Sequence, residues 1–238
     1  MLNAHDLVSV VKKVKPSVVG VGVFEPLAQP RNTLRGTGFV IGDGLHIVTN
    51  HHVLPDILDA EKRQQLVIFV GTGKEAKVRK ATLVASSDYY DLAILKVDGA
   101  PMPAMTLGQA EFLPEGSSIA YTGFPIGAVL GLYPVTHRGM VASVTPVIIP
   151  VSDTRQMSLV MLKRMRNPFM VYQLDGTAYP GNSGSAMYSV DTGEVVGIIN
   201  KVFVQSSKEA VISNPSGITY AIPVKHLREL LAEHKVQF

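Results

Sequence analysis

Short β-rich runs separated by turn-forming residues fill the chain from Ser17 to about Ile222, and this pattern constrains the fold most. Glycine, proline, asparagine and aspartate separate the runs, with no helical periodicity between them. Many short strands without intervening helices predict an all-β barrel or sandwich. The predicted strands lie at Ser17–Phe24, Gly38–Ile41, Ile47–Thr49, Leu66–Val70, Thr82–Ala85, Leu92–Val97, Ser118–Thr122, Met140–Val144, Met170–Leu174 and Val195–Asn200.

Helical patterns occur only near the two ends of the chain. Near the N-terminus, apolar residues recur at helical spacing until Pro16 stops the pattern: Leu7, Val8, Val11 and Val14. Near the C-terminus, Pro223 precedes a second apolar stripe: Leu227, Leu230 and Leu231. The sequence therefore predicts a β-rich body with one short helix at each end.

Prolines and glycines gather between Ala100 and Gly116, which predicts a seam between two β-rich halves. The chain of 238 residues fits one domain made of two tightly packed halves, here 1–105 and 106–238. A second irregular stretch, Pro146–Pro168, carries Arg155, Lys163, Arg164 and Arg166 and predicts a surface loop or flap with short structure of its own.

Composition excludes several classes of protein. Hydrophobic residues make up 46% and charged residues 17%, which is enough apolar material for a core and argues against disorder. The net charge of +3 is small and scattered, so no nucleic-acid partner is expected. The absence of cysteine excludes disulfides, thiolate metal ligands and a thiol nucleophile. No apolar run is long enough to span a bilayer, and no signal peptide begins the numbered chain.

The strongest local feature is the string Pro180–Ser185, in which Ser183 stands between Gly181 and Gly184. A serine on such a tight turn exposes its hydroxyl, and Gly181 can adopt backbone angles closed to other residues. The N–H groups of Gly181 and Ser183 can then converge on one point, as an oxyanion hole for acyl transfer requires. Taken alone, such a string is also an ordinary turn.

A serine nucleophile needs a base, and His51 and His52 are the best placed of the seven histidines. They follow the β-rich run Ile47–Thr49, where a strand ends and a side chain can be presented at a barrel rim. The third partner must be a carboxylate that orients the imidazole. Asp91, directly before the apolar run Leu92–Val97, and Asp88 are the candidates.

These segments resemble the HtrA/Deg family of trypsin-like serine peptidases, and the similarity extends through nearly the whole chain. Val48–Val53 resembles the family's Thr-Asn-Asn-His-Val motif, which assigns the catalytic role to His52 and not His51. Asp91–Lys96 resembles its Asp-Leu-Ala-Val-Leu-Lys motif, which favours Asp91 over Asp88. Further matching segments follow in family order: Gly36–Ile41, Gly123–Gly127, Gly139–Ser143 and Tyr220–Pro223.

The resemblance implies two antiparallel six-stranded β-barrels of the chymotrypsin-like fold, with the triad between them. It implies a serine endopeptidase acting on unfolded or misfolded proteins, with Ser183 as nucleophile and an oxyanion hole at Gly181, Asn182 and Ser183. Neither a cofactor nor a metal is expected. The alternative is a catalytically silent binding or chaperone-like module on the same fold.

The resemblance also suggests a substrate pocket. Thr177, six residues before the nucleophile, would form its floor, and a neutral residue there makes cleavage after Lys or Arg unexpected. The expected walls are Tyr179, Ile199 and Ile218, for a small to medium apolar side chain. Ser185 and Ala186 depart from the family's Gly-Asn-Ser-Gly-Gly-Pro string after the nucleophile.

The expected partners are protein or peptide substrates, and the family resemblance allows a homotrimer. Residues 1–16 contain none of the aromatic residues on which such trimers are built. The chain ends at Phe238, directly after the last predicted helix, so no PDZ domain is expected in it. An extracytoplasmic location is favoured if a signal peptide has been removed.

Overall fold

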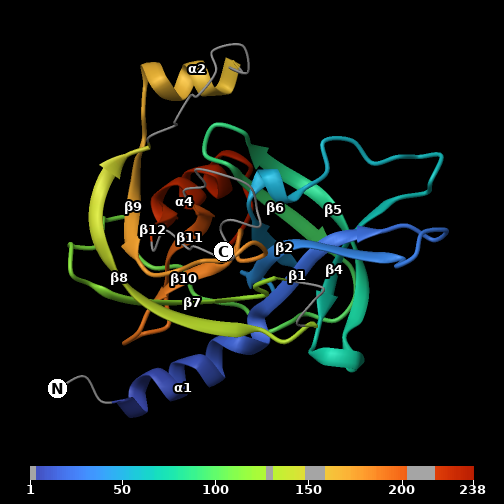
Figure 1. Ribbon diagram of the computed structural model, residues 1–238, viewed down its shortest axis with the longest axis horizontal. Helices are drawn as coiled ribbons and strands as arrows, with labels where there is room; N and C mark the ends of the chain where they lie inside the picture. The colour runs from blue at the N-terminus through green and yellow to red at the C-terminus, as the bar shows by residue number, and fades with distance from the viewer. Residues whose placement is uncertain (1–3, 127–130, 148–158, 203–217) are drawn as a thin grey trace.

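The chain folds into two closed six-stranded antiparallel barrels, as Figure 1 shows. The computed structural model describes residues 4–126, 131–147, 159–202 and 218–238. The predicted fold class is confirmed, because both barrels are closed and neighbouring strands in each of them run antiparallel.

The first barrel has the strand order β1-β2-β3-β6-β5-β4. Helix α1 (Ala4–Val14) and the 3₁₀ turn η1 (Lys15–Ser17) precede it. Its strands are β1 (Val18–Phe24), β2 (Asn32–Ile41), β3 (His46–Thr49), β4 (Gln65–Val70), β5 (Lys77–Ser87) and β6 (Leu92–Val97). Two further 3₁₀ turns connect them, η2 (His51–Val53) and η3 (Gly73–Glu75).

The second barrel has the strand order β10-β11-β12-β9-β8-β7. Its strands are β7 (Ser118–Gly123), β8 (Val135–Pro146), β9 (Met170–Asp175), β10 (Ala186–Ser189), β11 (Val195–Val202) and β12 (Ile218–Pro223). Helix α2 (Leu159–Arg166) lies between β8 and β9, and helix α4 (Val224–Glu233) follows β12. The strands predicted from the sequence pattern include neither β10 nor β12, although the family resemblance placed a closing strand at Tyr220–Pro223. The pattern also placed the starts of β2, β5 and β8 too late.

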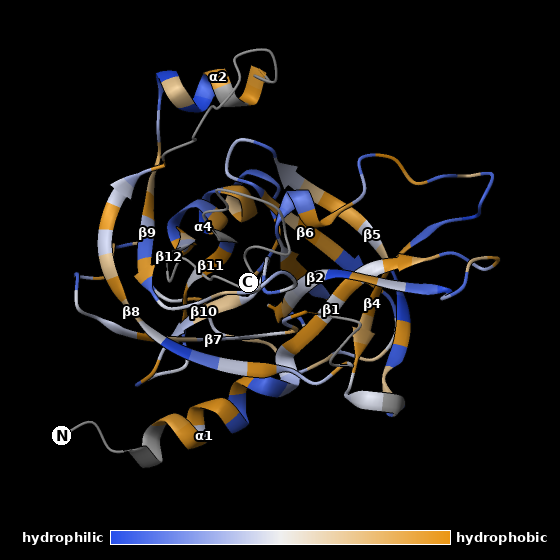
Figure 2. Cartoon of the chain, viewed as in Figure 1, coloured by the Kyte–Doolittle hydropathy of each residue, from blue (hydrophilic) through white to orange (hydrophobic). Residues whose placement is uncertain are grey.

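Strands at the centre of the molecule bury both of their faces, which explains their continuous apolar runs. In β6, Leu92 and Ile94 point into a core shared by both barrels, whereas Ala93 and Leu95 point into the first barrel. The shared core also holds Tyr188 of the second barrel. Figure 2 shows the resulting concentration of hydrophobic residues along the first barrel's strands. Because successive strand residues face opposite sides, two buried faces remove the usual alternation.

The linker between the barrels runs along each of them in turn. Met105 forms a parallel bridge with Ile41 of β2, and Leu107 forms one with Val195 of β11. These bridges use backbone groups of the Pro- and Gly-rich stretch in which the sequence predicted a seam. The domain division at 105/106 stays a prediction.

Helix α1 packs through a stripe that differs from the predicted one. Val10 and Val14 are buried in the shared core and Leu7 packs against it, whereas Val8 is 56% exposed. Leu7, Val10 and Val14 are spaced by three and four residues, so they share one face of the helix. Val8 lies outside that face, and its placement in the stripe was wrong.

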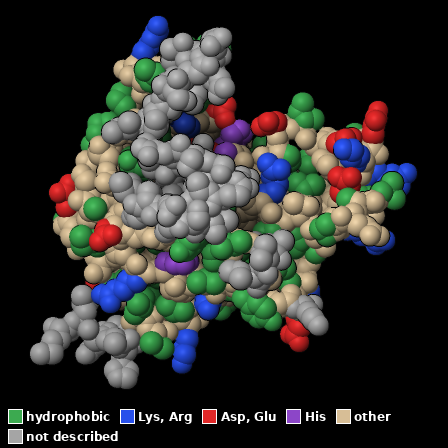
Figure 3. Space-filling model, viewed as in Figure 1, with side chains coloured by type: hydrophobic (Ala, Val, Ile, Leu, Met, Phe, Trp, Pro, Cys, Tyr) green, Lys and Arg blue, Asp and Glu red, His purple; other side chains and the backbone are tan. Residues whose placement is uncertain are grey.

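The distribution of charged side chains on the surface agrees with the small net charge of the chain. Figure 3 shows Lys and Arg interspersed with Asp and Glu on the face in view, without a large patch of one sign. Of the helices within the described residues, none combines the length and hydropathy needed to cross a membrane.

Helix α4 carries a buried histidine between two aromatic rings. The His226 ring stacks on Tyr90 at a centroid distance of 4.3 Å and meets Phe169 edge-on at 5.3 Å. Burial lowers the pKa of His226, and neighbouring Lys225 also lowers it, although Glu229 acts in the opposite direction. The neutral imidazole is therefore the form that the folded protein favours.

The pKa of His226 is lower in the folded chain than its ordinary value of 6.5. The neutral imidazole therefore contributes stability to the folded protein at pH values above 6.5. That contribution is lost as the pH falls from 6.5 through the lowered pKa. Replacing His226 by Phe keeps a ring at this position and removes the titration. We expect the stability of His226→Phe to fall less on acidification than that of the parent, measured by urea unfolding between neutral and acidic pH. If the free energy of unfolding fell equally with pH in the two proteins, this assignment to His226 would be contradicted.

Candidate active site

The turn between β5 and β6 places Asp91 against His52. His52 Nδ1 lies 2.6 Å from Asp91 Oδ2, and the backbone N–H of His52 donates to Asp91 Oδ1 at 2.9 Å. The Asp91 side chain is 8% exposed and that of His52 is 32% exposed. One carboxylate thus fixes both the ring and the backbone of the histidine.

This contact determines the protonation pattern of the ring. An ionised carboxylate only accepts hydrogen bonds, so Nδ1 carries the proton in the neutral imidazole. Nε2 on the opposite side of the ring then holds a free lone pair, which is the arrangement that a general base requires.

Asn50 holds the backbone of Asp91, and no sequence pattern had assigned it a role. Its Nδ2 donates to the Asp91 carbonyl at 2.9 Å, and the N–H of His51 donates to the same oxygen at 3.2 Å. Asp91 adopts a φ of +56°, a left-handed conformation that aspartate tolerates better than most residues. Residues 50–52 therefore support both the backbone and the side chain of Asp91.

His51 and Asp88, the alternatives weighed on sequence grounds, form a second pair beside the first. His51 Nε2 lies 2.8 Å from Asp88 Oδ1. Asp88 is 61% exposed in its side chain, so solvent screens this pair far more than the pair of His52 and Asp91.

The Ser183 turn lies between β9 and β10 and reaches across to the first barrel. The Thr37 N–H of β2 donates to the Ser183 carbonyl at 2.9 Å. At Gly184, where φ is +86°, a Cβ would lie 2.1 Å from the Thr37 carbonyl and 3.2 Å from the Asn50 nitrogen. Only glycine allows this approach, which brings the serine turn against the segment that carries His52.

The Ser183 hydroxyl donates to the carbonyl of Asn200 in β11 at 2.8 Å. Among the described residues, no hydrogen bond joins Ser183 Oγ to His52. The turn of Ser183 therefore lies against the segment that precedes His52, with the hydroxyl turned toward β11.

Backbone geometry at Gly181 bears on the predicted oxyanion hole. The Pro180 carbonyl accepts a hydrogen bond from the Ile126 N–H at 2.7 Å. In a trans peptide the C=O and the following N–H point in opposite directions, so this bond turns the Gly181 N–H away from Ile126. Within the described residues no acceptor is recorded for the N–H of Gly181 or Ser183, and Asn182 between them is fully buried.

Thr37 joins the two barrels at this turn, and sequence reasoning missed it. Its Oγ1 donates to the Gly181 carbonyl at 2.7 Å and accepts from the Phe124 N–H at 3.0 Å. Thr49 Oγ1 in turn donates to the Thr37 carbonyl at 2.7 Å. The string Gly36–Thr37–Gly38 contained the only sequence signal, a small polar residue between glycines in a strand.

A neutral side chain contacts the backbone of Thr177, the predicted pocket floor. The Thr177 carbonyl accepts from the Tyr121 hydroxyl at 2.7 Å, and burial raises the pKa of Tyr121, so the phenol remains a donor. His137 stacks on Tyr121 at 5.1 Å and lies 6.1 Å from the Tyr179 ring. Burial lowers the pKa of His137, which favours the uncharged imidazole at neutral pH.

Of the two isoleucines predicted as pocket walls, the structure describes the side chain of Ile199 alone. Ile199 is 1% exposed and lies in the interior core of the second barrel. Ile218 pairs through its backbone with Asp175 at the start of β12, and its side chain lies outside the described part of the structure. In the described ranges, no group of three or more His, Asp or Glu side chains is arranged to hold a metal ion.

Two closed barrels, one carrying a His–Asp pair and the other a glycine-flanked serine, define the chymotrypsin-like double-barrel class. A family model described as a trypsin-like peptidase domain matches residues 36–198. The chain therefore belongs to the trypsin-like peptidase family, and its curated relatives bear the names of HtrA- and DegP-type serine endoproteases.

A probable periplasmic serine endoprotease DegP-like from Halomonas elongata is 32% identical over 189 residues, covering 79% of this chain and 32% of that protein. Serine protease HTRA1B of Danio rerio is 29% identical over 236 residues, covering 95% of this chain and 41% of that protein. The chain thus spans less than half the length of either relative.

Solved structures agree in fold. The serine endoprotease from Yersinia pestis superimposes with a TM-score of 0.67 at 24% identity, over 96% of this chain and 66% of that one. The HtrA-type protease AlgW with tripeptide superimposes with a TM-score of 0.70 at 23% identity, over 97% of this chain and 63% of that one. At such identities these likenesses establish the double barrel alone.

Replacing Thr37 by Val should destabilise the protein by about 1–3 kcal/mol, because the Gly181 carbonyl and the Phe124 N–H lose their buried partner. Thr37→Ser keeps the hydroxyl and loses one methyl group, which costs about 1 kcal/mol. Urea unfolding should therefore rank the parent above Thr37→Ser and Thr37→Ser above Thr37→Val. A valine variant as stable as the serine variant would show that the hydroxyl does not join the barrels.

Proposed function

We propose that the chain is a serine endopeptidase that hydrolyses peptide bonds of unfolded proteins through His52, Asp91 and Ser183. The observation that carries the proposal is the double hold of Asp91 on His52, at 2.6 Å to the ring and 2.9 Å to the backbone. A buried carboxylate in this position orients the imidazole and stabilises the imidazolium formed when it takes up a proton.

Ser183 acts as the nucleophile in this proposal. Its hydroxyl rotates from the Asn200 carbonyl toward His52 Nε2 when a substrate is bound. The oxygen then attacks the carbonyl carbon of the scissile bond while Nε2 takes up the hydroxyl proton. Hydrogen bonds of this kind are often long in a free enzyme and tighten when substrate binds.

The N–H groups of Gly181 and Ser183 face the oxygen of the tetrahedral intermediate. The hydrogen bond from Ile126 to Pro180 supports this role, since it turns the Gly181 N–H in the opposite direction. Donors that are fixed before the reaction stabilise the developing charge at no reorganisation cost.

Collapse of the intermediate breaks the carbon–nitrogen bond and leaves an acyl group on Ser183. The protonated His52 gives its proton to the departing amine. A water molecule then attacks the acyl-enzyme, with His52 again taking up a proton, and the peptide acid leaves as Ser183 regains its hydrogen.

The pocket at Thr177 accepts an apolar side chain of small to medium size. Tyr121, which contacts Thr177, and His137, which stacks on Tyr121, support this preference, because neither supplies a carboxylate for Lys or Arg. Tyr179, Ile199 and Ile218 remain the proposed walls.

One observation favours the alternative of a silent binding or chaperone-like module. The Ser183 hydroxyl is bonded to Asn200 rather than to His52, as in a protein that does not use it as a nucleophile. Preservation of the complete His–Asp pair favours the enzyme, since a binding module has no need of an oriented imidazole.

The decisive comparison is digestion of casein by the parent and by Ser183→Ala. The variant should lose activity by at least about 10³-fold, because the nucleophile and its proton transfer are removed together. Ser189→Ala is the matched control, since Ser189 lies at the end of β10 and its hydroxyl accepts from N–H groups of its own turn.

Equal digestion by Ser183→Ala and the parent would refute Ser183 as nucleophile. A parent that cuts neither casein nor an unfolded peptide, yet slows aggregation of an unfolded protein, would establish the silent module instead.

The periplasmic names of DegP-like relatives support an extracytoplasmic location for this chain, which cell fractionation tests directly. A homotrimer remains the proposed assembly, with sedimentation velocity as its test.

A further inference from the structure

The turn that carries the Asp91 carboxylate is held by contacts from both barrels. Residues 88–91 connect β5 to β6, and the Asp91 N–H donates to the Asp88 carbonyl at 3.3 Å within the turn. Asp91 itself adopts a φ of +56°. A turn with a left-handed residue at its end needs its neighbours to hold it in one conformation.

Arg164 of helix α2 provides such a contact from the second barrel. Its Nε donates to the Tyr89 carbonyl at 2.8 Å, and its Nη2 donates to the Asp88 carbonyl. The guanidinium presents its donors in a fixed planar fork, so binding two successive carbonyls fixes the orientation of the peptide between them. Arg164 is half-buried, whereas the neighbouring Arg166 is exposed.

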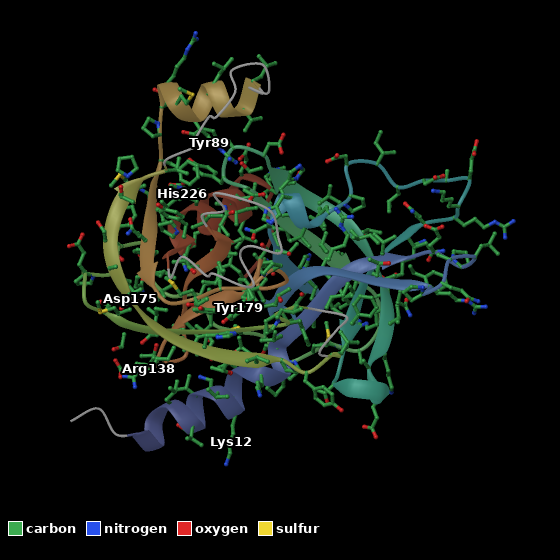
Figure 4. All side chains as sticks on the ribbon, in the orientation of Figure 1. Lys12, Tyr89, Arg138, Asp175, Tyr179 and His226 are labelled. Carbon is green, nitrogen blue, oxygen red and sulfur yellow. The ribbon has the colours of Figure 1, made fainter. Side chains whose placement is uncertain are left out.

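Aromatic contacts hold the same turn on both of its tyrosines. Lys163 Nζ lies 4.9 Å from the centroid of the Tyr89 ring, and the Tyr89 hydroxyl donates to the Asn167 carbonyl. Phe169 packs on Tyr89 at 5.4 Å and on Tyr90 at 5.1 Å. In Figure 4, Tyr89 lies below α2, with His226 beneath it.

The first barrel holds the other side of the turn. The side chain of Asp88 pairs with His51, and that of Asp91 pairs with His52. The turn is therefore held between the histidine segment on one side and α2 on the other. A shift of α2 would change the forces on the peptide units that place Asp91.

We infer that Arg164 is a positioning residue, which fixes the Asp88–Asp91 turn so that the Asp91 carboxylate meets His52 in one geometry. This inference rests on the proposed function, because that function assigns Asp91 the role of orienting His52. The basic segment around α2 thereby gains a specific role. Through Arg164, the second barrel fixes the position of the Asp91 carboxylate in the first barrel. Without Arg164 the turn gains freedom, and the Nδ1 proton of His52 loses a fixed acceptor.

The direct readout is the proton NMR resonance of His52 Nδ1–H, which a short bond to a carboxylate moves far downfield. His52→Gln identifies the resonance by removing it. In Arg164→Ala we expect it to broaden or move upfield, and in Arg164→Lys as well, because one ammonium cannot reproduce the planar fork. Arg166→Ala removes the same charge from the same helix and should leave the resonance unchanged.

Kinetics provide the second readout. A misplaced carboxylate should lower kcat of Arg164→Ala by about 10–100-fold with KM within about twofold, since it impairs proton transfer rather than binding. Should Arg164→Ala fail to fold, Tyr89→Phe replaces it. That variant keeps the ring and loses only the bond to Asn167, so a smaller shift of the same resonance is expected.

A folded Arg164→Ala with the parent's resonance and kcat would overturn the positioning role, as would equal changes in Arg164→Ala and Arg166→Ala. A parent that cuts no substrate would refute the peptidase, and the NMR comparison would still decide whether Arg164 positions Asp91.

Discussion

The hydrogen bonds of Thr37 join the serine turn of the second barrel to the first barrel. A single residue of β2 binds Gly181 and Phe124 through its hydroxyl and Ser183 through its N–H, and it accepts a bond from Thr49. Glycine at position 184 allows this approach, because a Cβ there would lie 2.1 Å from the Thr37 carbonyl. The serine turn of the second barrel is thus joined to the first barrel by one backbone hydrogen bond and by short threonine side chains.

A shared core makes this junction rigid. Leu92 and Ile94 of the first barrel and Tyr188 of the second belong to one buried cluster, which α1 and α4 close from outside. The chemistry divides along the same line: the first barrel supplies the proposed base and its carboxylate, and the second supplies the proposed nucleophile and oxyanion donors. Close packing resists relative movement of the two halves, so residues from both can keep one geometry.

The sequence could predict features that depend on local pattern. Runs such as Leu92–Val97 became strands, and the strings around His52, Asp91 and Ser183 marked turns at strand ends. It could not show features that arise from distant contacts. Strand β10 has four residues directly after the serine turn and no pattern of its own. Asn50 and Arg164 carry no local signal, and Thr37 carries only its place between two glycines, because their partners lie at Asp91, Asp88 and Gly181. Val8 fits the helical spacing, and only packing excludes it.

We propose that the Ser183 hydroxyl, here bonded to Asn200, belongs to one reactive centre with His52 and the N–H groups of Gly181 and Ser183. A crystal structure of the protein after reaction with an organic fluorophosphonate tests this most directly. We expect phosphorus bound to Ser183 Oγ, with one phosphoryl oxygen accepting from both N–H groups and His52 Nε2 facing the adduct. An unmodified Ser183 beside an intact pair of His52 and Asp91, or an adduct whose oxygen points away from Gly181, would contradict it.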